Sequence, residues 1–201
     1  MIAIIDYGVG NLFSLKSSFA AIDIDAVITH DEKIIKNADH IILPGVGAFK
    51  EAISKLYDSG MDEVLKREIA AGKPVMGICL GMQLLVDKSF EHGEFEGLKL
   101  IDGTCVSIQS GDAKNLKIPH MGWNALDFDY SCPIFKYINQ KDAVYFVHSY
   151  HVRDCNNVVA TTEYGNKLTA AIAKDNLFGC QFHPEKSGQV GLNILRAFSE
   201  V

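Results

Sequence analysis

The first half of the chain alternates between short apolar runs and segments with helical periodicity, and this pattern restricts the fold more than any other sequence feature. The apolar runs are nearly continuous, as expected for strands buried on both faces of a sheet. The segments between them repeat apolar residues every three or four positions, as helices that cover a sheet do. Strands are expected at residues 1–5, 25–29, 40–45 and 74–79, and helices at residues 11–22, 48–56 and 62–73. This alternation predicts a mostly parallel sheet with helices on both faces.

The second half of the chain is mostly strand-like, with turn signals between the runs. The expected strands are residues 104–109, 117–126, 143–152, 158–164, 168–173 and 178–185, and a closing helix is expected at residues 188–201. We therefore predict an α/β fold, in which helices flank a mostly parallel central sheet that carries an antiparallel β annex. No linker, repeat or low-complexity segment divides the sequence, so a single domain is expected over residues 1–201.

Charge and cysteine content argue against several classes of function. The formal net charge of −6 disfavours a nucleic-acid partner, because a polyanion is bound by a basic surface. Neither a membrane span nor a signal peptide is recognisable, so no membrane association is expected. The five cysteines are widely spaced without a C-x-x-C pair, which favours free thiols in the cytoplasm over disulfides or a zinc site. We expect no metal ion and no cofactor.

Residues 77–81 read Gly-Ile-Cys-Leu-Gly and lie where an apolar run gives way to a helical pattern. This G-x-C-x-G string has the form of a nucleophile elbow, a tight strand-to-helix turn that presents its central side chain above a sheet. Glycine suits both flanking positions, because the strand and the helix meet too closely there for side chains. The start of a helix also favours the thiolate form of a cysteine. Cys79 is therefore the candidate nucleophile, and a buried structural cysteine is the alternative.

A thiolate nucleophile needs an acid–base partner and a group that orients this partner. His183 and Glu185 offer both, since they stand two positions apart on an expected extended segment and so point the same way. Pro184 lacks an N–H group, which places the pair at the end or edge of a strand. Taken alone, His183 and Glu185 would be read as exposed residues at a strand end, but together with Cys79 they suggest a catalytic triad.

An oxyanion-binding turn is expected at residues 44–47, Pro-Gly-Val-Gly, directly after a buried strand. The backbone N–H groups of Val46 and Gly47 could join that of Leu80 around a developing negative charge. An ordinary strand-to-helix turn is the alternative. The glycines do not form a nucleotide-binding motif, because Phe13 or Lys50 stands where G-x-G-x-x-G requires its third glycine, and no P-loop string occurs.

Several strings together resemble a known family. Gly-Ile-Cys-Leu-Gly-Met-Gln at 77–83, the turn at 44–47 and Phe-His-Pro-Glu at 182–185 resemble the class I, triad-type glutamine amidotransferases. The strings at 5–12, 119–124, 146–150 and 179–188 are similar to those of one subfamily, the glutaminase subunits of imidazole glycerol phosphate synthases of histidine biosynthesis. The likeness runs from the first expected strand to the last helix and is weakest over about residues 87–116 and 125–142. It implies the class I amidotransferase fold.

The resemblance implies a reaction and a substrate, glutamine. Cys79 would attack the side-chain amide of glutamine, with the oxyanion held at the 44–47 turn and at Leu80. His183, oriented by Glu185, would protonate the leaving ammonia and then activate water to hydrolyse the thioester. Acid–base help of this kind contributes about 10²–10⁴-fold to a rate. The residues implied to bind glutamine are Gly47, Gln83, His148, Ser149 and Tyr150.

Two of these positions have ordinary alternatives. Gln83 lies one helical turn after Cys79, and by itself it would be read as a helix-surface residue. His148 stands in an alternating, strand-like run and could equally be a core or edge histidine.

The resemblance also implies a partner, the (βα)₈-barrel cyclase subunit with which such glutaminases form a heterodimer. Through an internal passage, the cyclase takes up ammonia and forms imidazole glycerol phosphate and an aminoimidazole carboxamide ribotide. Asn11, His120, Met121 and Trp123 would lie near the docking face, although Trp123 could instead anchor the core. Glutamine turnover is expected to be slow until the partner's ligand is bound, by re-orientation of a peptide in the 44–47 turn.

Three other readings compete with this one. A related amidotransferase that feeds ammonia to a partner aminating surface-polysaccharide sugars would share nearly all of these motifs. A non-catalytic scaffold subunit is disfavoured, because Cys79, His183 and Glu185 are all present. A stand-alone cysteine hydrolase is disfavoured by Gln83 and by the string at residues 119–124.

Overall fold

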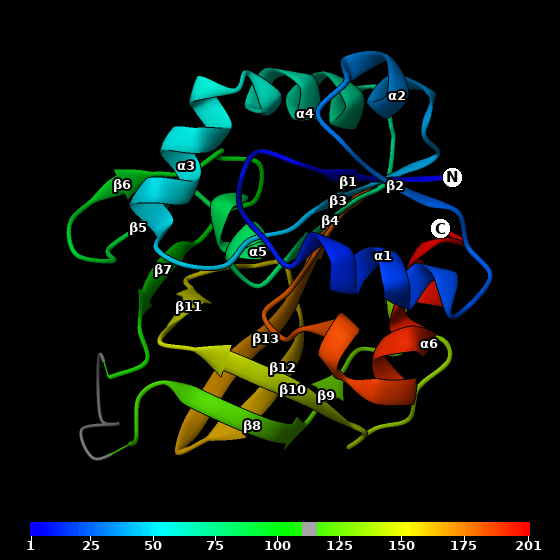
Figure 1. Cartoon of the computed structure of the whole chain (residues 1–201). Helices are drawn as coiled ribbons and strands as arrows, with labels where there is room; N and C mark the ends of the chain where they lie inside the picture. Colours follow the sequence, from blue (N-terminus) through cyan, green and yellow to red (C-terminus); the bar gives the residue numbers. More distant parts are fainter. Residues whose placement is uncertain (110–115) are drawn as a thin grey trace.

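A computed structural model describes residues 1–109 and 116–201 as an α/β structure around one eight-stranded sheet (Figure 1). The strands follow the order β2-β1-β3-β4-β14-β13-β12-β9. Strands β2 to β14 of this order are parallel, and β13, β12 and β9 continue the sheet in antiparallel pairing. The bounds are β1 Ile2–Ile5, β2 Ala26–Thr29, β3 His40–Leu43, β4 Val75–Ile78, β9 Asp127–Phe128, β12 Val158–Tyr164, β13 Asn166–Lys174 and β14 Leu177–Cys180. The predicted fold class is therefore confirmed.

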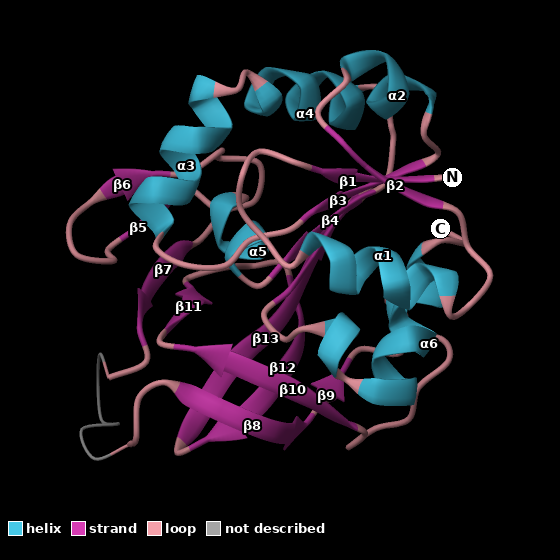
Figure 2. Cartoon of the chain, viewed as in Figure 1, coloured by secondary structure: helices cyan, strands magenta, loops and turns pink. Residues whose placement is uncertain are grey.

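Helices cover both faces of the parallel strands. Figure 2 shows α2, α3 and α4 on one side and α1 and α6 on the other. Their bounds, with that of the short α5, are α1 Leu12–Ala20, α2 Glu32–Asn37, α3 Phe49–Asp58, α4 Met61–Ala70, α5 Leu80–Leu84 and α6 Gly188–Phe198. Along β1, Ile2 and Ile4 belong to the core beneath α1 and α6, whereas Ala3 and Ile5 belong to the core beneath α2, α3 and α4. Burial on both faces explains why the run at the N-terminus is continuously apolar.

Within the described residues, no helix combines the length and the apolar character that a membrane crossing requires. One helix, α2, was not expected from the sequence, because six residues are too few to display a helical period. The sequence marks the start of α2 only by its N-cap residue, Asp31, whose side chain accepts a hydrogen bond from the backbone N–H of Lys33 at 2.8 Å.

The run at residues 143–152 forms two strands, not the single strand expected. β10 pairs antiparallel with β8 up to the pair of His148 and His120, and after Ser149 the chain enters a different sheet as β11, which pairs with β7. The bounds are β8 His120–Ala125, β10 Ala143–His148, β11 Tyr150–Arg153 and β7 Thr104–Ser107, and the sheet of β11 also holds β5 Lys88–Ser89 and β6 Phe95–Glu96. Burial alternates strictly along β10, but at the break Ser149 and Tyr150 are both partly buried and the alternation is interrupted. The sequence itself keeps apolar or aromatic residues at positions 144, 146, 150 and 152, so its pattern could not reveal the break.

The strand expected at residues 178–185 is also shorter. β14 ends at Cys180, and Pro184–Lys186 form a 3₁₀ turn instead of an extended segment. Pro184 suits the first position of such a turn, because its missing N–H group needs no partner there. A second 3₁₀ turn covers Pro133–Phe135.

Candidate active site

Cys79 occupies the turn between β4 and α5, with backbone angles φ 55° and ψ −108°. A positive φ costs a residue with a side chain about 1–3 kcal/mol and persists only where the surroundings enforce it. A Cβ atom on Gly77 would lie 2.7 Å from the backbone of Gly81, and one on Gly81 would lie 2.0 Å from the carbonyl oxygen of Leu43. Helix α5 therefore lies too close to β4 for a side chain at Gly77 and too close to β3 for a side chain at Gly81, and these contacts hold the turn that presents Cys79.

His183 and Glu185 follow β14, the strand that pairs with β4. Nδ1 of His183 lies 2.8 Å from Oε1 of Glu185, and the two side chains are only 2% and 1% exposed. Burial alone would lower the pKa of His183, but its hydrogen bonds to Cys79 and Glu185 and their negative charges raise that pKa to about 9. At neutral pH the imidazole is thus protonated, with Nδ1–H donating to the carboxylate and the other ring nitrogen available to the sulfur.

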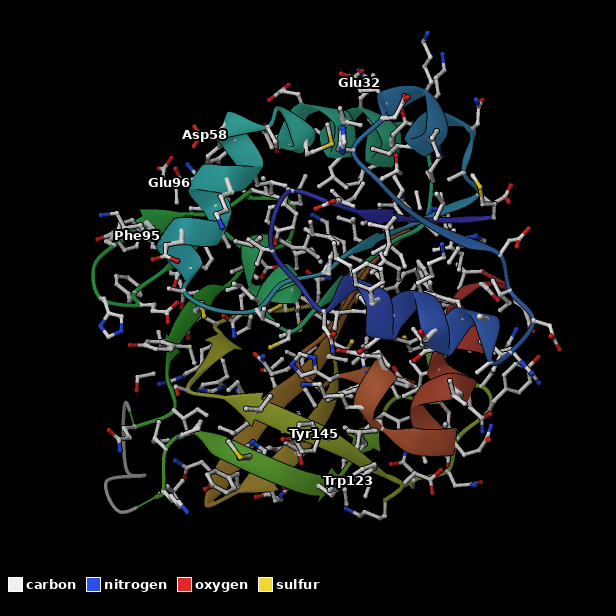
Figure 3. All side chains as sticks on the ribbon, in the orientation of Figure 1. Glu32, Asp58, Phe95, Glu96, Trp123 and Tyr145 are labelled. Atoms are coloured by element: carbon white, nitrogen blue, oxygen red, sulfur yellow. The ribbon has the colours of Figure 1, made fainter. Side chains whose placement is uncertain are left out.

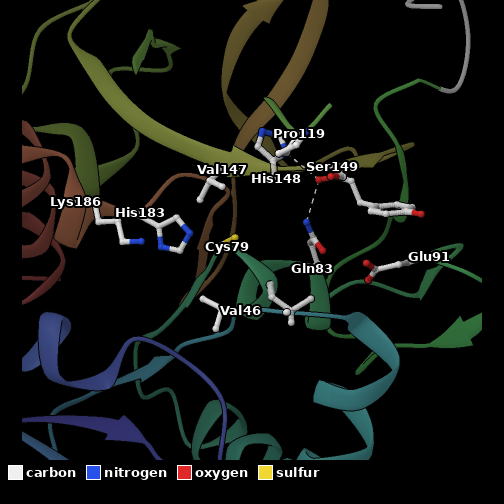
Figure 4. Close-up of a pocket in the computed structure, with 13 residues that line it drawn as sticks. Val46, Cys79, Gln83, Glu91, Pro119, Val147, His148, Ser149, His183 and Lys186 are labelled. Carbon is white, nitrogen blue, oxygen red and sulfur yellow. Dashed lines mark hydrogen bonds between the residues drawn. The ribbon is translucent and has the colours of Figure 1, made fainter. Parts of the chain in front are cut away.

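Cys79 and His183 face one cavity of about 310 Å³ (Figure 4). Besides these two residues, its lining comprises Val46, Gly47, Leu80, Gln83, Glu91, Pro119, Val147, His148, Ser149, Tyr150 and Lys186. Each residue whose N–H group was expected to bind an oxyanion, and each residue expected to bind glutamine, is among them. Glu185 does not line this cavity, because it lies behind the imidazole that it contacts.

The turn at residues 44–47 has a fixed beginning and an open end. The hydroxyl of Tyr7 donates to the carbonyl oxygen of Pro44 at 2.7 Å, and a Cβ atom on Gly45 would lie 2.6 Å from the backbone nitrogen of Gly81. In contrast, Val46 is 42% exposed, and Gly47 has φ 94° with no atom within 4 Å of a Cβ position. The N–H groups expected to bind an oxyanion therefore belong to the part of the turn that has room to re-orient.

The family is decided by comparison with known proteins. Residues 3–200 match the family model described as glutamine amidotransferase class-I, which leaves out only the ends of the chain. The chain belongs to the class-I glutamine amidotransferase family. The resemblance noted in the sequence is thereby confirmed.

Two relatives match this amidotransferase over its whole length. The imidazole glycerol phosphate synthase subunit HisH of Caldanaerobacter subterraneus subsp. tengcongensis is 52% identical, over 100% of this chain and 98% of the relative. The protein of the same name from Sulfurimonas denitrificans is 47% identical, with the same coverage. A solved structure described as glutamine amidotransferase superposes with a TM-score of 0.77 at 15% identity, over 100% of this chain and 98% of that one, and supports the fold alone.

Gln83 of the amidotransferase is not a surface residue. It is 4% exposed, and its Nε2 donates both to the carbonyl oxygen of Tyr150, at 3.1 Å, and to Oε1 of Gln181, at 2.9 Å. Both of its N–H bonds are thus engaged, and only its carbonyl oxygen remains for a ligand. Gln83 can accept a hydrogen bond from an ammonium or amide group in the cavity, but it cannot donate to a carboxylate.

His148 is a buried histidine on the side of the cavity. Its Nδ1 lies 2.8 Å from the carbonyl oxygen of Tyr150 and its Nε2 lies 2.9 Å from Nδ1 of His120, whose Nε2 lies 2.8 Å from Oδ1 of Asn124. Burial lowers the pKa of His148 to about 3 and also lowers the pKa of His120. Two neutral imidazoles supply two N–H groups for three contacts, so one contact must bring two acceptors together. One additional proton on His120 or His148 would be needed to make all three contacts hydrogen bonds.

The residues implied to lie near a partner divide between surface and interior. On β8, Met121 and Trp123 are 61% and 56% exposed, so Trp123 is not a core anchor. His120, on the opposite face of the same strand, is fully buried and presents no side chain to a partner. Asn11 is partly exposed just before α1. Figure 3 shows Trp123 beside Tyr145 of β10, and their ring centroids are 6.1 Å apart.

Sequence reasoning missed several residues of this site. Glu91 lines the cavity, and its Oε2 accepts a hydrogen bond from the backbone N–H of Phe49 at 2.6 Å. It belongs to a stretch with no recognisable motif, so only the folded chain brings it to the cavity. Lys186 lines the cavity from the 3₁₀ turn. Tyr7 and Gln181 lie within the strings at residues 5–12 and 179–188. Their hydrogen-bond partners are Pro44 and Cys79, 37 and 102 positions away, and could not be inferred from spacing.

Proposed function

We propose that the chain is the glutamine-hydrolysing subunit of an imidazole glycerol phosphate synthase and supplies ammonia for histidine biosynthesis. The observation that carries this proposal is the grouping of Cys79, His183 and Glu185 at a cavity bordered by the turn at residues 44–47. The 52% identity with a synthase subunit over the full length favours this subfamily within the amidotransferases.

In the proposed reaction, the thiolate of Cys79 attacks the side-chain carbonyl carbon of glutamine. The carbonyl oxygen becomes an oxyanion, which the N–H groups of Val46 or Gly47 and of Leu80 stabilise; one such donor contributes roughly 10²–10³-fold to the rate. Protonated His183 gives its proton to the amide nitrogen as the carbon–nitrogen bond breaks and ammonia leaves. His183 then takes a proton from water, the resulting hydroxide attacks the thioester, and glutamate and the thiolate are released. Glu185 keeps the imidazole in place through both steps.

Recognition of glutamine would use a negative charge in the part of the cavity away from His183. Glu91 supplies a carboxylate, and Gln83 presents only its carbonyl oxygen, so both suit the α-ammonium group of an amino acid. The backbone of Ser149 and Tyr150 lies on the same cavity and is available to the α-carboxylate. A free amino acid therefore fits better than a peptide, whose blocked amine carries no charge.

The partner in this proposal is the barrel cyclase subunit, docked over Asn11, Met121 and Trp123. Ammonia released into water at neutral pH would be mostly protonated and no longer nucleophilic, so delivery within a complex makes chemical sense. We also propose that residues 1–201 form a single domain and that the protein works in the cytoplasm, where its five free thiols would remain reduced.

Adding the partner tests the proposal. Glutamate release should be weak for the chain alone and should rise steeply when the cyclase subunit and its ribotide ligand are present. A glutamine-mimicking diazoketone should label Cys79, and Cys79→Ala should abolish labelling. Labelling of another cysteine in equal yield contradicts the assigned nucleophile, whereas an unchanged rate with the cyclase points to another partner, such as a sugar-aminating enzyme.

A further inference from the structure

A row of side-chain amides behind the cavity reaches the nucleophile. Gln181 is completely buried, and its Nε2 lies 3.6 Å from the sulfur of Cys79, within reach of an N–H···S hydrogen bond. Its Oε1 accepts a hydrogen bond from Gln83 at 2.9 Å, and Gln83 also donates to the carbonyl oxygen of Tyr150 at 3.1 Å. Two amides therefore connect the backbone of β11 with the sulfur.

The carbonyl group of Tyr150 determines how both amides are oriented. A backbone carbonyl only accepts hydrogen bonds, so Gln83 must turn its NH₂ group toward it. The same NH₂ group faces Gln181, which must then present its oxygen to Gln83 and its own NH₂ group to Cys79. A reversed Gln181 would bring two NH₂ groups together and place an oxygen against the sulfur. The row thus delivers a hydrogen-bond donor to the sulfur.

We infer that Gln181 is a further functional residue, whose amide donates a hydrogen bond to the thiolate of Cys79 and stabilises the nucleophile before glutamine binds. Hydrogen bonds to ionised groups are roughly twice as strong as those between neutral groups, so this donor favours the thiolate over the thiol. The inference rests on the proposed function only in naming Cys79 as the nucleophile. Gln181 is completely buried, so its amide is shielded from solvent.

Gln181→Met tests the inference, because methionine keeps the length of the side chain and removes the N–H group. Alkylation of Cys79 by iodoacetamide, followed by peptide mass spectrometry across a pH series, gives the pH midpoint of thiolate formation. We expect this midpoint to rise by about one pH unit when the charged hydrogen bond is lost. Cys155, which is partly exposed, is an internal reference whose alkylation should not change.

The matched control is Gln140→Met. The amide of Gln140 also binds backbone, accepting from the N–H of Phe128 at 3.1 Å, but its partner is Phe128 and not Cys79 or Gln83. Its replacement should leave the Cys79 midpoint unchanged. An unchanged midpoint in Gln181→Met, in protein with an unaltered unfolding temperature, overturns the inference.

A second measurement needs no change at Gln181. In the unsubstituted protein, the side-chain amide resonances of Gln181 should move with the same pH midpoint as Cys79 alkylation, and Cys79→Ala should remove this response. Amide resonances that stay constant across the range overturn the inference as well. Neither measurement uses glutamine or a partner. If Gln181→Met shifts the midpoint of Cys79 alkylation but the protein has no glutaminase activity, the result counts against the proposed function alone. If the protein is an active glutaminase but the alkylation midpoint and the Gln181 amide resonances stay constant, the result counts against the role of Gln181 alone.

Discussion

At the scale of single residues, His183 couples the ionisation of the site to folding. Its pKa of about 9 lies above the ~6.5 of an imidazole in an unfolded chain, because Cys79 and Glu185 favour the protonated ring. A pKa raised by folding contributes stability that is fully present below about pH 6.5 and is lost as the pH rises through about 9. The same loss of the proton removes the general acid that ammonia needs as it leaves.

Replacing the sulfur tests this coupling. In Cys79→Ala the pKa of His183 should fall from about 9 toward its ordinary value, because one of the two groups that favour the protonated ring is gone. The measurement is an NMR titration of the histidine ring protons. Cys132→Ala is the control, since burial raises the pKa of that thiol to about 11 and keeps it neutral. A His183 pKa that stays near 9 without the sulfur contradicts the assigned cause.

At the scale of elements, two close contacts set the geometry of the site: α5 against β3, and the beginning of the 44–47 turn against Tyr7. Both leave the reacting groups exposed to the cavity while their supports are buried. Each contact can be tested by adding or removing a single group.

Gly81→Ala should lower the free energy of unfolding by about 3 kcal/mol or more, because the new methyl group overlaps the carbonyl oxygen of Leu43. Urea unfolding measures the loss. Gly72→Ala is the matched control, since Gly72 has φ 88° with open space around it and should cost only about 1–2 kcal/mol. Equal losses in the two variants would mean that the close approach of α5 has little effect on stability.

Tyr7→Phe removes only the hydroxyl that holds the carbonyl of Pro44. We expect the partner-stimulated kcat to fall about 3–10-fold, in line with the loss of one buried hydrogen bond, with little change in KM. Steady-state kinetics distinguish the two constants. Tyr57→Phe, which removes a hydroxyl 3.3 Å from the carbonyl oxygen of Gly97, should have no effect, because neither residue lines the cavity. A rise in KM at constant kcat would instead indicate a role in binding glutamine.

Periodicity and motifs predicted the parallel half of the sheet and pointed to Cys79, His183 and Glu185, because these depend on local patterns. They did not predict that Pro184 opens a 3₁₀ turn, and it is in this turn that the contact between His183 and Glu185 forms. Glu91 and Gln181 could not be assigned at all, since their positions depend on contacts between distant segments. The division of residues 143–152 between two sheets was equally hidden, because the residue types keep a period of two past Ser149 although the burial of the folded chain does not.

At the scale of the whole molecule, Met121 and Trp123 form an exposed apolar pair on β8, near the cavity that Pro119 and Val147 help to line. Large exposed aromatic and methionine side chains are typical of the centres of protein interfaces. The exposure of this pair supports the docking face proposed above.

Trp123→Ala should therefore weaken binding of the cyclase subunit about tenfold or more, as expected for an aromatic side chain that becomes buried at the centre of an interface. Isothermal titration calorimetry measures the dissociation constant. Tyr57→Ala provides the comparison, because Tyr57 is also exposed, at 44%, but lies on α3, far from β8 in Figure 1. Equal affinities for Trp123→Ala and the unsubstituted chain would move the docking face elsewhere.

Only Ser149 separates the strand that borders the exposed pair from the strand whose carbonyl anchors Gln83. A connection of one residue leaves the two strands little freedom to move independently. If the proposed partner shifts the β8–β10 ribbon when it docks, Ser149 is the one residue that can absorb the movement before it reaches the carbonyl group of Tyr150 and the two glutamine amides that lead to the sulfur. Communication between subunits would then need a shift of a few bond rotations, with no rearrangement of the surrounding sheets.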